Sequence, residues 1–396
     1  MHVVLSYERN ESPKMNLSSL AKNALMLRGR LSKRGYMRWW HSFSGVSEET
    51  GITRSFFIEF LIVNPALGGE YPILGQYPYH KKNGIKPSYV CIHAGAFPTA
   101  DGEEGVHLRS YYPVSSLKTT PSPLVMQVDH CFCSEEKLEG FVDVSPEEAA
   151  GKCLMTQAGT MSWKLEVHKA VSCNTGYLSG RLFRMLNALD SYWHGEGVKS
   201  FFRGSVTLNG EVYRITPELS NGYADKHWGQ KFNRPWLQFS CGELISERTG
   251  QKLRHSVLAI NGCCPRFLFL PLRRKLLIQL TYTGEDFDFG FRPFVLSGCR
   301  LETKETNRRY IWHILAQNNS AVIKISGSCT KEQMLQIKYE DPDGLCSRIP
   351  LLIGAAGSGT VSIYRRRGDQ RELLDTLHME RAYCAYRPAP PAQKRN

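Results

Sequence analysis

The feature of this 396-residue sequence that most limits its fold is a succession of short alternating segments separated by turn-forming residues. The clearest example is residues 198–215, VKSFFRGSVTLNGEVYRI, where Asn209 and Gly210 lie between two runs rich in β-branched and aromatic residues. Asn-Gly is a strong hairpin signal because both turn positions require a positive φ. The pattern predicts a β-hairpin here.

The same pattern continues along most of the chain. Further strands are predicted at RSFFIEFLIVNP (54–65), MSWKLEVHKAV (161–171), RHSVLAI (254–260), DFDFGFRPFVL (286–296), RRYIWHILAQ (308–317), AVIKISG (321–327), MLQIKYED (334–341) and GTVSIYRR (359–366). Little helical pattern lies between them to carry parallel crossovers. The sequence therefore predicts an all-β protein, built as an antiparallel barrel or sandwich.

One segment departs from the β pattern. Residues 179–192, SGRLFRMLNALDSY, place four apolar side chains at helical spacing on one face, which predicts a helix that covers a barrel mouth or a sheet edge. At 396 residues the chain also exceeds the usual size of a single hydrophobic core. We expect two domains with a boundary near residues 216–218, and a disordered, proline-rich tail at 387–396.

The charge balance raises the question of an anionic partner, and the alternative is a set of solvated surface faces. The chain carries 50 Lys and Arg against 37 Asp and Glu, a formal net charge of +13, but these basic residues lie in separated groups. No nucleic-acid-binding motif is present, so an anionic membrane surface is favoured over nucleic acid. Residues 15–34 lack acidic side chains and fit a transit peptide, an interfacial helix or a plain amphipathic lead-in equally well.

The twelve cysteines form no CxxC pair, so neither a structural zinc site nor a disulfide framework is predicted. No apolar signal segment opens the chain, and no run approaches the ~18 uninterrupted apolar residues needed to span a bilayer. We expect a cytoplasmic protein with reduced cysteines, in peripheral contact with a membrane surface.

Three aromatic-rich clusters are candidates for a functional site. They are GYMRWWHSFSG (35–45), SYWHGEGVK (191–199) and GYADKHWGQKFNRPWLQFSCGEL (222–244). The chain has no GxSxG elbow, no HExxH and no phosphate loop, which disfavours hydrolases, zinc proteases and nucleotide-dependent enzymes. Indole-rich walls with a few carboxylic acids suit a pocket for a long apolar molecule.

Glu59 lies within a strongly apolar segment, FFIEFL. Strand alternation places Phe57, Glu59 and Leu61 on one face. If both faces are buried, Glu59 points into a cavity where desolvation raises the pKa of its carboxyl group, which suits a general acid. The alternatives are an exposed face or a buried ion pair with Arg38 or Arg54.

The residues of the third cluster also allow two interpretations. Asp225 can cap a turn, pair with Lys226 or a distant arginine, or act as an acid. His227 can be a hydrogen-bonded core imidazole or a proton carrier. Trp228 and Trp236 can anchor a barrel floor or line a ligand cavity.

In combination, these segments resemble the tocopherol cyclase family. The resemblance covers roughly residues 31–385 and is carried by GYMRWWHSF, RSFFIEFLIVNPAL, PILGQYPY, GTMSWKLEV, YWHGEG and the third cluster. The family's matching turn has an Asn where this chain has His227. The resemblance implies two lipocalin-like, calycin-type antiparallel β-barrels with one or two short helices. The chain would then divide into a lead-in at 1–30, a first barrel at 31–216, a second barrel at 217–386 and the tail at 387–396.

The resemblance also implies a chemistry, in which a carboxylic acid protonates an alkene of a prenylated quinol and a ring hydroxyl captures the cation to close a chromanol. No metal and no redox cofactor are required. The implied catalytic residues are Asp225 or Glu59 as proton donor, with His227, His194 and Tyr192 orienting the phenol or shuttling its proton. The implied substrate-binding residues are Trp40, Trp163, Trp193, Trp228, Trp236, Arg38, Glu196 and Lys226.

Two other functions fit the same features. One is a non-catalytic carrier or sensor of a prenyl lipid, and the other is a hydratase or isomerase of a different terpenoid. All three expect an isoprenoid small molecule as ligand, and none expects nucleic acid.

Overall fold

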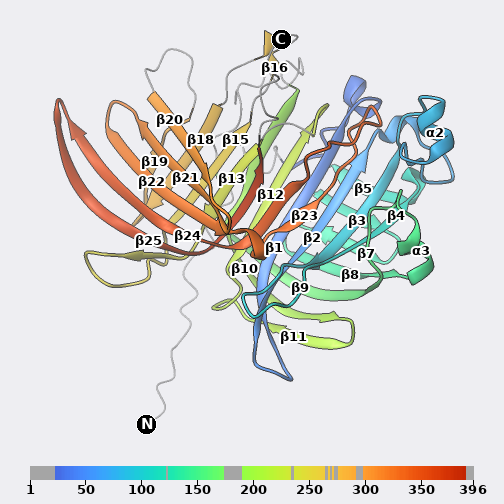
Figure 1. Ribbon diagram of the computed structural model, residues 1–396, viewed down its shortest axis with the longest axis horizontal. Coiled ribbons are helices and arrows are strands. Elements are labelled where there is room, and N and C mark those ends of the chain that lie inside the picture. The colour runs from blue at the N-terminus through green and yellow to red at the C-terminus, as the bar shows by residue number, and fades with distance from the viewer. Residues whose placement is uncertain are drawn as a thin grey trace.

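The structure is a computed structural model that describes residues 23–121, 124–173, 190–232, 236–263, 266–267, 270–271, 275–290 and 298–388. These residues form two large antiparallel sheets, each curled into a barrel (Figure 1). The predicted fold class is confirmed as an all-β protein with two antiparallel barrels and only short helices.

The first sheet has twelve strands in the order β4-β3-β2-β1-β11-β10-β9-β8-β7-β6-β5, with β12 paired to both β1 and β10. Edge strand β4 packs against β8, so the sheet curls round on itself. The strands are β1 (Tyr36–Ser47), β2 (Thr53–Val63), β3 (Tyr89–Ala96), β4 (Val106–Tyr112), β5 (Leu117–Pro121), β6 (Leu124–Val128), β7 (Cys131–Ser134), β8 (Lys137–Val144), β9 (Gly159–Val171), β10 (Ser191–Leu208), β11 (Glu211–Ile215) and β12 (Gly222–Gly229).

The second sheet has eleven strands in the order β19-β18-β15-β13-β25-β24-β22-β21-β20, with β14 beside β25 and β23 beside β24. A separate two-stranded sheet joins β16 (Arg266–Phe267) and β17 (Leu270–Pro271). The strands of the large sheet are β13 (Trp236–Cys241), β14 (Leu244–Ser246), β15 (Val257–Cys263), β18 (Lys275–Tyr282), β19 (Glu285–Asp288), β20 (Gly298–Glu305), β21 (Arg309–Gln317), β22 (Ala321–Thr330), β23 (Leu335–Ile337), β24 (Leu351–Arg367) and β25 (Gln370–Arg387).

Helices are short throughout the described chain. They are η1 (Gly29–Ser32), η2 (Pro65–Leu67), α2 (Pro78–Lys82), η3 (Val114–Ser116), α3 (Pro146–Ala150) and η4 (Lys331–Gln333). None is long and apolar enough to cross a membrane, within the part of the chain that was placed. The predicted helix at 179–192 falls mostly outside the described residues, and its last two positions, Ser191 and Tyr192, begin β10. Most of the lead-in at 1–30 and of the tail at 387–396 also lies outside them.

The predicted hairpin is confirmed at β10 and β11. Asn209 and Gly210 form its turn with φ values of 50° and 91°. Strand β10 is long enough to pair twice, because its second half pairs with β11 and its first half with β12. Strand β1 also pairs twice, because its first part pairs with β12 and its last residues pair with β11. Strand β12 therefore lies between the first halves of β1 and β10.

The change from one sheet to the other falls between β12 and β13. Tyr36–Ser42 of β1 pair with β12, which places Gly222–Gly229 in the first sheet, and β13 begins the second. The cluster at 222–244 therefore contributes one strand to each sheet, rather than opening the second barrel as a unit. The domain limits drawn at residue 216 stay a prediction.

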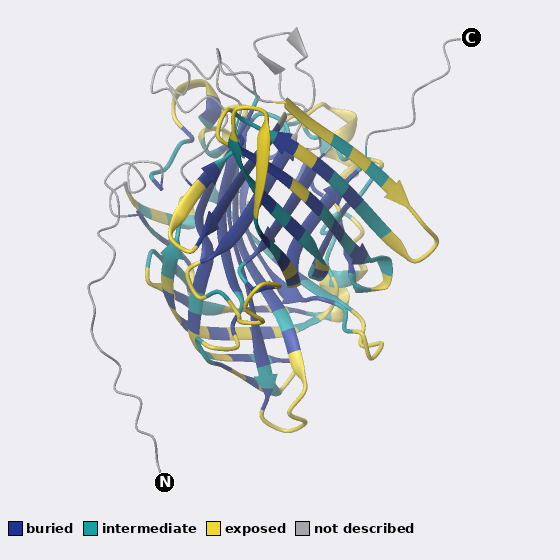
Figure 2. Cartoon of the chain, turned by 90° about the vertical axis from the view of Figure 1, so that its left-hand side faces the viewer, coloured by how far each residue is buried: buried dark blue, intermediate teal, exposed yellow. Residues whose placement is uncertain are grey.

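The two sheets share a packed interface, which we call the seam. The hydrophobic core of the first barrel continues into the second sheet, taking in Trp236, Leu351, Ile353 and Tyr383. A separate core fills the second barrel. Because the seam covers the outer face of β1, β2 and β12, both faces of these strands are buried, and Figure 2 shows the central strands buried over most of their length.

Candidate active site at the seam

Strand register brings the polar residues of the seam onto one face of the first sheet. Trp40 of β1 lies opposite Glu59 of β2 and Asp225 of β12, and Glu59 lies opposite His93 of β3. Directly opposed residues of neighbouring antiparallel strands project from the same face. Arg38, two positions before Trp40, shares this face, which is turned toward the second sheet.

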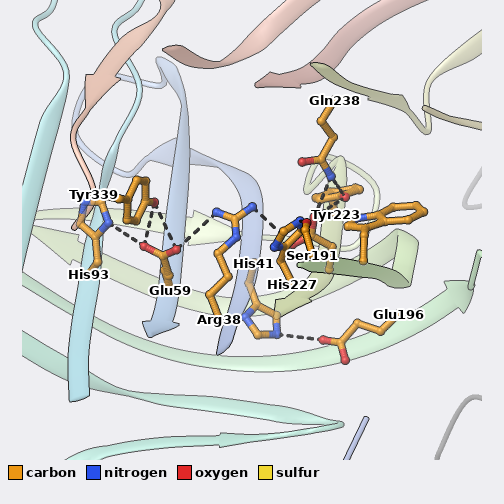
Figure 3. Close-up of polar contacts among 12 residues, drawn as sticks. Arg38, His41, Glu59, His93, Ser191, Glu196, Tyr223, His227, Gln238 and Tyr339 are labelled. Atoms are coloured by element: carbon orange, nitrogen blue, oxygen red, sulfur yellow. Dashed lines mark hydrogen bonds and ion pairs between the residues drawn. The ribbon is translucent and has the colours of Figure 1, made fainter. Parts of the chain in front are cut away.

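Arg38 lies between the two predicted acids. Its Nη1 is 3.3 Å from Glu59 Oε1 and its Nη2 is 3.8 Å from Asp225 Oδ1, and all three side chains are fully buried (Figure 3). Burial by itself would lower the pKa of Arg38, but the charges of Asp225 and Glu59 outweigh it and hold the pKa well above its ordinary value. The guanidinium is thus a buried cation, with three aromatic rings within 5.4 Å of it: Trp40, Phe232 and Trp236.

Glu59 is held by three partners from three parts of the chain. Besides Arg38, its carboxylate bonds His93 Nδ1 at 2.9 Å and accepts from the hydroxyl of Tyr339, 2.9 Å from Oε2 (Figure 3). Burial would raise the pKa of Glu59, but the His93 hydrogen bond and the Arg38 charge hold it below its ordinary value. Of the sequence-based alternatives for Glu59, the buried ion pair with Arg38 is the one found.

His93 is a neutral partner in this group. Burial and the nearby Arg109 charge lower the pKa of His93 to about 4. A neutral imidazole beside a carboxylate donates from the nitrogen that faces it, so Nδ1 is assigned the proton.

Asp225 has two oxygens in different situations. Oδ2 accepts hydrogen bonds from Trp193 Nε1 at 2.9 Å, from the Tyr223 hydroxyl at 2.8 Å and from Gln238 Nε2 at 2.6 Å. Oδ1 has no hydrogen-bond partner among the described residues, and Arg38 is the charge beside it. The carboxyl group is therefore fixed through one oxygen, while the other faces the seam.

His227 lies beside this acid as a neutral side chain. Its Nδ1 is 2.6 Å from the Tyr36 hydroxyl and its Nε2 is 3.3 Å from Ser191 Oγ. Burial and the charge of Arg38 lower the pKa of His227 well below its ordinary value. Its ring packs on Trp236 with centroids 4.1 Å apart.

Seven of the thirteen predicted site residues meet at the seam. They are Arg38, Trp40, Glu59, Trp193, Asp225, His227 and Trp236. The other six are not brought to it. Sequence alternation alone did not show which face of each strand the second sheet would cover.

Five of those six lie on the opposite face, inside the first barrel. Tyr192 and Trp228 stack on each other, and Lys226 is opposite both His194 and Trp39. Lys226 Nζ donates to the Ala24 carbonyl and lies 5.2 Å from the ring centres of Trp39 and Trp228. Burial lowers its pKa to about 7.

Glu196 completes this interior group. It forms an ion pair with Lys169 at 3.0 Å and lies 3.6 Å from His41, a contact that Figure 3 shows apart from the Glu59 group. Burial raises the pKa of Glu196. The sixth residue, Trp163 of β9, packs inside the first barrel against Gly140, away from both groups.

Several residues of the seam were not predicted as site residues. They are His93, Tyr223, Gln238, Tyr339 and Tyr383, which bond or pack on the predicted acids and indoles. The alternation of YVCIHAGA places His93 on one face of a strand, and Tyr223 is within the quoted cluster. Tyr339 and Tyr383 carry no local signal, because they reach the seam from positions more than 100 residues along the chain, Tyr339 from the segment after β23 and Tyr383 from β25.

A groove of about 400 Å³ lies elsewhere, on the second sheet. It is lined mainly by polar side chains of β20, β21, β22 and β24, among them Arg300, His313 and Lys324. It contains none of the predicted residues. Among the described residues, no group of three or more His, Cys, Asp or Glu side chains is arranged to hold a metal ion.

No family model matches this sequence, and no curated protein matches it. Among solved structures, the chain is similar to the crystal structure of kievitone hydratase from Nectria haematococca, with 11% sequence identity and a TM-score of 0.40 over 88% of each chain. The site is therefore assigned from the chain's own contacts.

Proposed function

We propose that this protein catalyses a proton-initiated reaction of an isoprenoid substrate at the seam, of the tocopherol cyclase type, closing a prenylated quinol to a chromanol. The observation that supports this most is the asymmetry of Asp225. Three donors fix Oδ2, while Oδ1 has no hydrogen-bond partner in the described chain. Asp225 is the ion-pair partner of Arg38, so the proposed reaction requires Oδ1 to take up a proton first. That proton then faces the seam from a carboxyl group that cannot turn.

The surroundings of Asp225 suit proton donation to an alkene. Once the proton leaves, the Asp225 carboxylate lies 3.8 Å from the Arg38 cation. Glu59 already balances part of the Arg38 charge. Trp193 donates its N–H to Asp225, and the rings of Trp40 and Trp236 pack on Arg38. Indole faces stabilise a developing carbocation by about 2 kcal/mol when water is excluded.

In this proposal Glu59 is a positioning residue and not the proton donor. Its contacts with His93 and Arg38 favour the carboxylate, so it holds Arg38 in place beside Asp225. His227 is a positioning residue as well, because both of its ring nitrogens are already bonded, to Tyr36 and to Ser191. His194 and Tyr192 have no part in the reaction, since they project into the first barrel.

The test is turnover of a prenylated quinol in detergent by the wild-type protein and by Asp225→Asn. Loss of a general acid lowers turnover by about 10²–10⁴-fold, and Asn keeps the size and an acceptor for the three donors. The matched control is Asp375→Asn, a buried and hydrogen-bonded aspartate of the second barrel, where we expect turnover to be kept. If the wild-type protein closes no quinol, or Asp225→Asn closes it as fast, the proposal is wrong.

A non-catalytic carrier of a prenyl lipid is the second candidate. The contacts of Asp225 with three donors and with Arg38 are also those of a carboxylate that only fastens one sheet to the other. Native mass spectrometry separates the two candidates. A carrier returns its lipid chemically unchanged after incubation, whereas a cyclase returns the chromanol. A terpenoid hydratase would instead incorporate the oxygen of heavy-oxygen water.

An isoprenoid quinol resides in membranes, so the proposal includes contact with an anionic membrane surface. The exposed basic residues of the described chain are compatible with such contact. They include Arg28, Arg30, Lys33 and Arg34 around η1, and Lys81 and Lys82 in α2.

A further inference from the structure

Five of the eleven exposed large apolar side chains of the described residues, including the three most exposed, lie in or beside the connection between β2 and β3. Within the described chain, the three most exposed large apolar residues are Tyr71 at 78%, Tyr79 at 70% and Leu345 at 64%. Tyr77 and Leu67 are exposed as well. Four of these five residues come from the connection between β2 and β3, which contains η2 and α2 (Figure 1).

Leu345 reaches the same end from the second half of the chain. Gln76 Nε2, next to Tyr77, donates to the Gly344 carbonyl at 2.7 Å and to Glu340 Oε1 at 3.1 Å. Leu345 follows Gly344 directly, so its side chain lies beside the turn that leads into α2. Apolar residues more than 250 positions apart thus meet on one face.

This face is also basic. Lys81 and Lys82 are exposed in the last turn of α2, and η1, which carries exposed Arg28 and Arg30, lies against η2. The nearby acids reduce the charge only in part. Glu70 is exposed beside Tyr71, and Asp343 is engaged in an ion pair with Lys231.

We propose that this aromatic-basic face, made of Leu67, Tyr71, Tyr77, Tyr79 and Leu345 with Lys81 and Lys82, docks on an anionic lipid surface. Tyrosine rings are amphipathic and concentrate at membrane interfaces, while lysines are attracted to anionic headgroups. Exposed rings flanked by lysines combine both features on one surface. The choice of lipid as partner rests on the proposed function, since an isoprenoid substrate is taken from a membrane.

The position of the face adds to the argument. Leu345 belongs to the same crossing segment, residues 338–346, as Tyr339, whose hydroxyl bonds Glu59 at the seam. Docking would therefore place the lipid surface against the segment that covers the candidate active site.

The test is binding to vesicles of phosphatidylcholine alone and of phosphatidylcholine with phosphatidylserine, measured by co-sedimentation. We expect the wild-type protein to bind the phosphatidylserine vesicles, with binding that weakens as salt is raised. We expect two double variants, Tyr77→Ser/Tyr79→Ser and Lys81→Gln/Lys82→Gln, to bind these vesicles more weakly than the wild-type protein. The affinity of each should fall by about tenfold or more. These side chains are exposed, so we expect the thermal unfolding midpoint to stay unchanged.

Matched controls lie on the β24–β25 hairpin, on the other side of the molecule from α2 (Figure 1). Leu373→Ser removes an apolar side chain that is 52% exposed, and Arg366→Gln/Arg367→Gln removes two basic charges. Both should bind vesicles like the wild-type protein. The inference is overturned if the wild-type protein binds no vesicle, if the face variants bind as well as it does, or if the controls lose as much binding.

A second copy of the chain is the competing occupant. A dimer that forms without lipid and is lost in Tyr77→Ser/Tyr79→Ser would also overturn the inference. Failure of docking is distinguishable from failure of the proposed function, because the face variants should still turn over quinol presented in detergent. Vesicle binding without any turnover of quinol would support the docking face and contradict the proposed enzymatic function.

Discussion

At the residue scale, the seam depends on one arginine that balances two acids. Arg38 has an accessible fraction of 0%, as have Glu59 and Asp225. Burying three charges costs free energy unless each has a partner, and here Arg38 is the charged partner of both acids. Arg38, which the sequence predicts as a substrate-binding residue, thus also offsets the free-energy cost of burying the carboxylates of Glu59 and Asp225.

We expect Arg38→Met to destabilise the protein by about 3–5 kcal/mol, because it leaves two carboxylates buried without their cation. Adding Glu59→Gln to Arg38→Met should recover part of that loss, since one of the two unbalanced charges is removed. Urea denaturation of the wild type, the single variant and the double variant measures both effects. An unfolding free energy of Arg38→Met equal to that of the wild type would contradict this account of Arg38.

At the element scale, the crossing segment 338–346 connects the second sheet to the first barrel and covers the seam. Asn64 Nδ2 donates to the Pro342 carbonyl at 2.7 Å, and Arg109 Nη2 donates to the Lys338 carbonyl at 2.8 Å. The segment lies between β23 and β24 and has no strand of its own. Because Glu59 and Asp225 are fully buried, the proposed function requires part of the seam to open.

Glu340 makes the attachment of this segment sensitive to pH. Its carboxylate accepts from Gln76 Nε2 and from the Gly75 amide, and it lies near His80, Asp343 and Tyr89. Burial raises the pKa of Glu340 to about 7. The folded protein therefore binds a proton that the unfolded chain releases at its ordinary, lower pKa.

The stabilisation from this proton is fully present below the ordinary carboxyl pKa and is lost as the pH rises to about 7. We expect Glu340→Gln, which cannot ionise, to remove this loss and to be more stable than the wild type at pH 8, by at most about 3 kcal/mol. The readout is the difference in unfolding free energy between the two proteins at pH 5 and pH 8. If the difference in unfolding free energy between Glu340→Gln and the wild type is the same at pH 5 and pH 8, the pKa of Glu340 is not raised in the folded protein.

Strand alternation predicted the elements well but not the grouping of the site. The Asn209-Gly210 turn and the strand through Glu59 form where the sequence placed them. However, alternation gives two faces without saying which one another sheet covers. Lys226 and Asp225 are adjacent in the sequence, yet they project into the first barrel and into the seam respectively.

At the scale of the whole molecule, the two barrels are joined by the core of the first barrel, which continues into the second sheet, and by a buried lysine. Lys199 of β10 donates to the carbonyls of Gly242, Leu253 and Ser256, which belong to the second half of the chain. Trp236 and Tyr383 of the second sheet pack in the core of the first barrel. The sequence could not predict this union, because its residues come from separate strands with no shared motif.

Because of this shared core, we expect the two barrels to unfold in one transition. The calorimetric and van't Hoff enthalpies of unfolding should then agree. Trp312 is the indole of the second core and Trp163 lies in the first barrel. The fluorescence of Trp312→Phe and of Trp163→Phe should therefore change at the same temperature. Two separate transitions would mean that the seam is a contact between independent domains.

The most direct test of the central claim, that Asp225 delivers a proton to an isoprenoid alkene at the seam, is turnover of a prenylated quinol in heavy water. We expect the wild-type protein to yield a cyclised product with one deuterium on the carbon next to the new carbon–oxygen bond. Asp225→Asn should bind the quinol and leave it unlabelled. Quinol that binds to the wild-type protein and is recovered without deuterium and without ring closure would contradict the account.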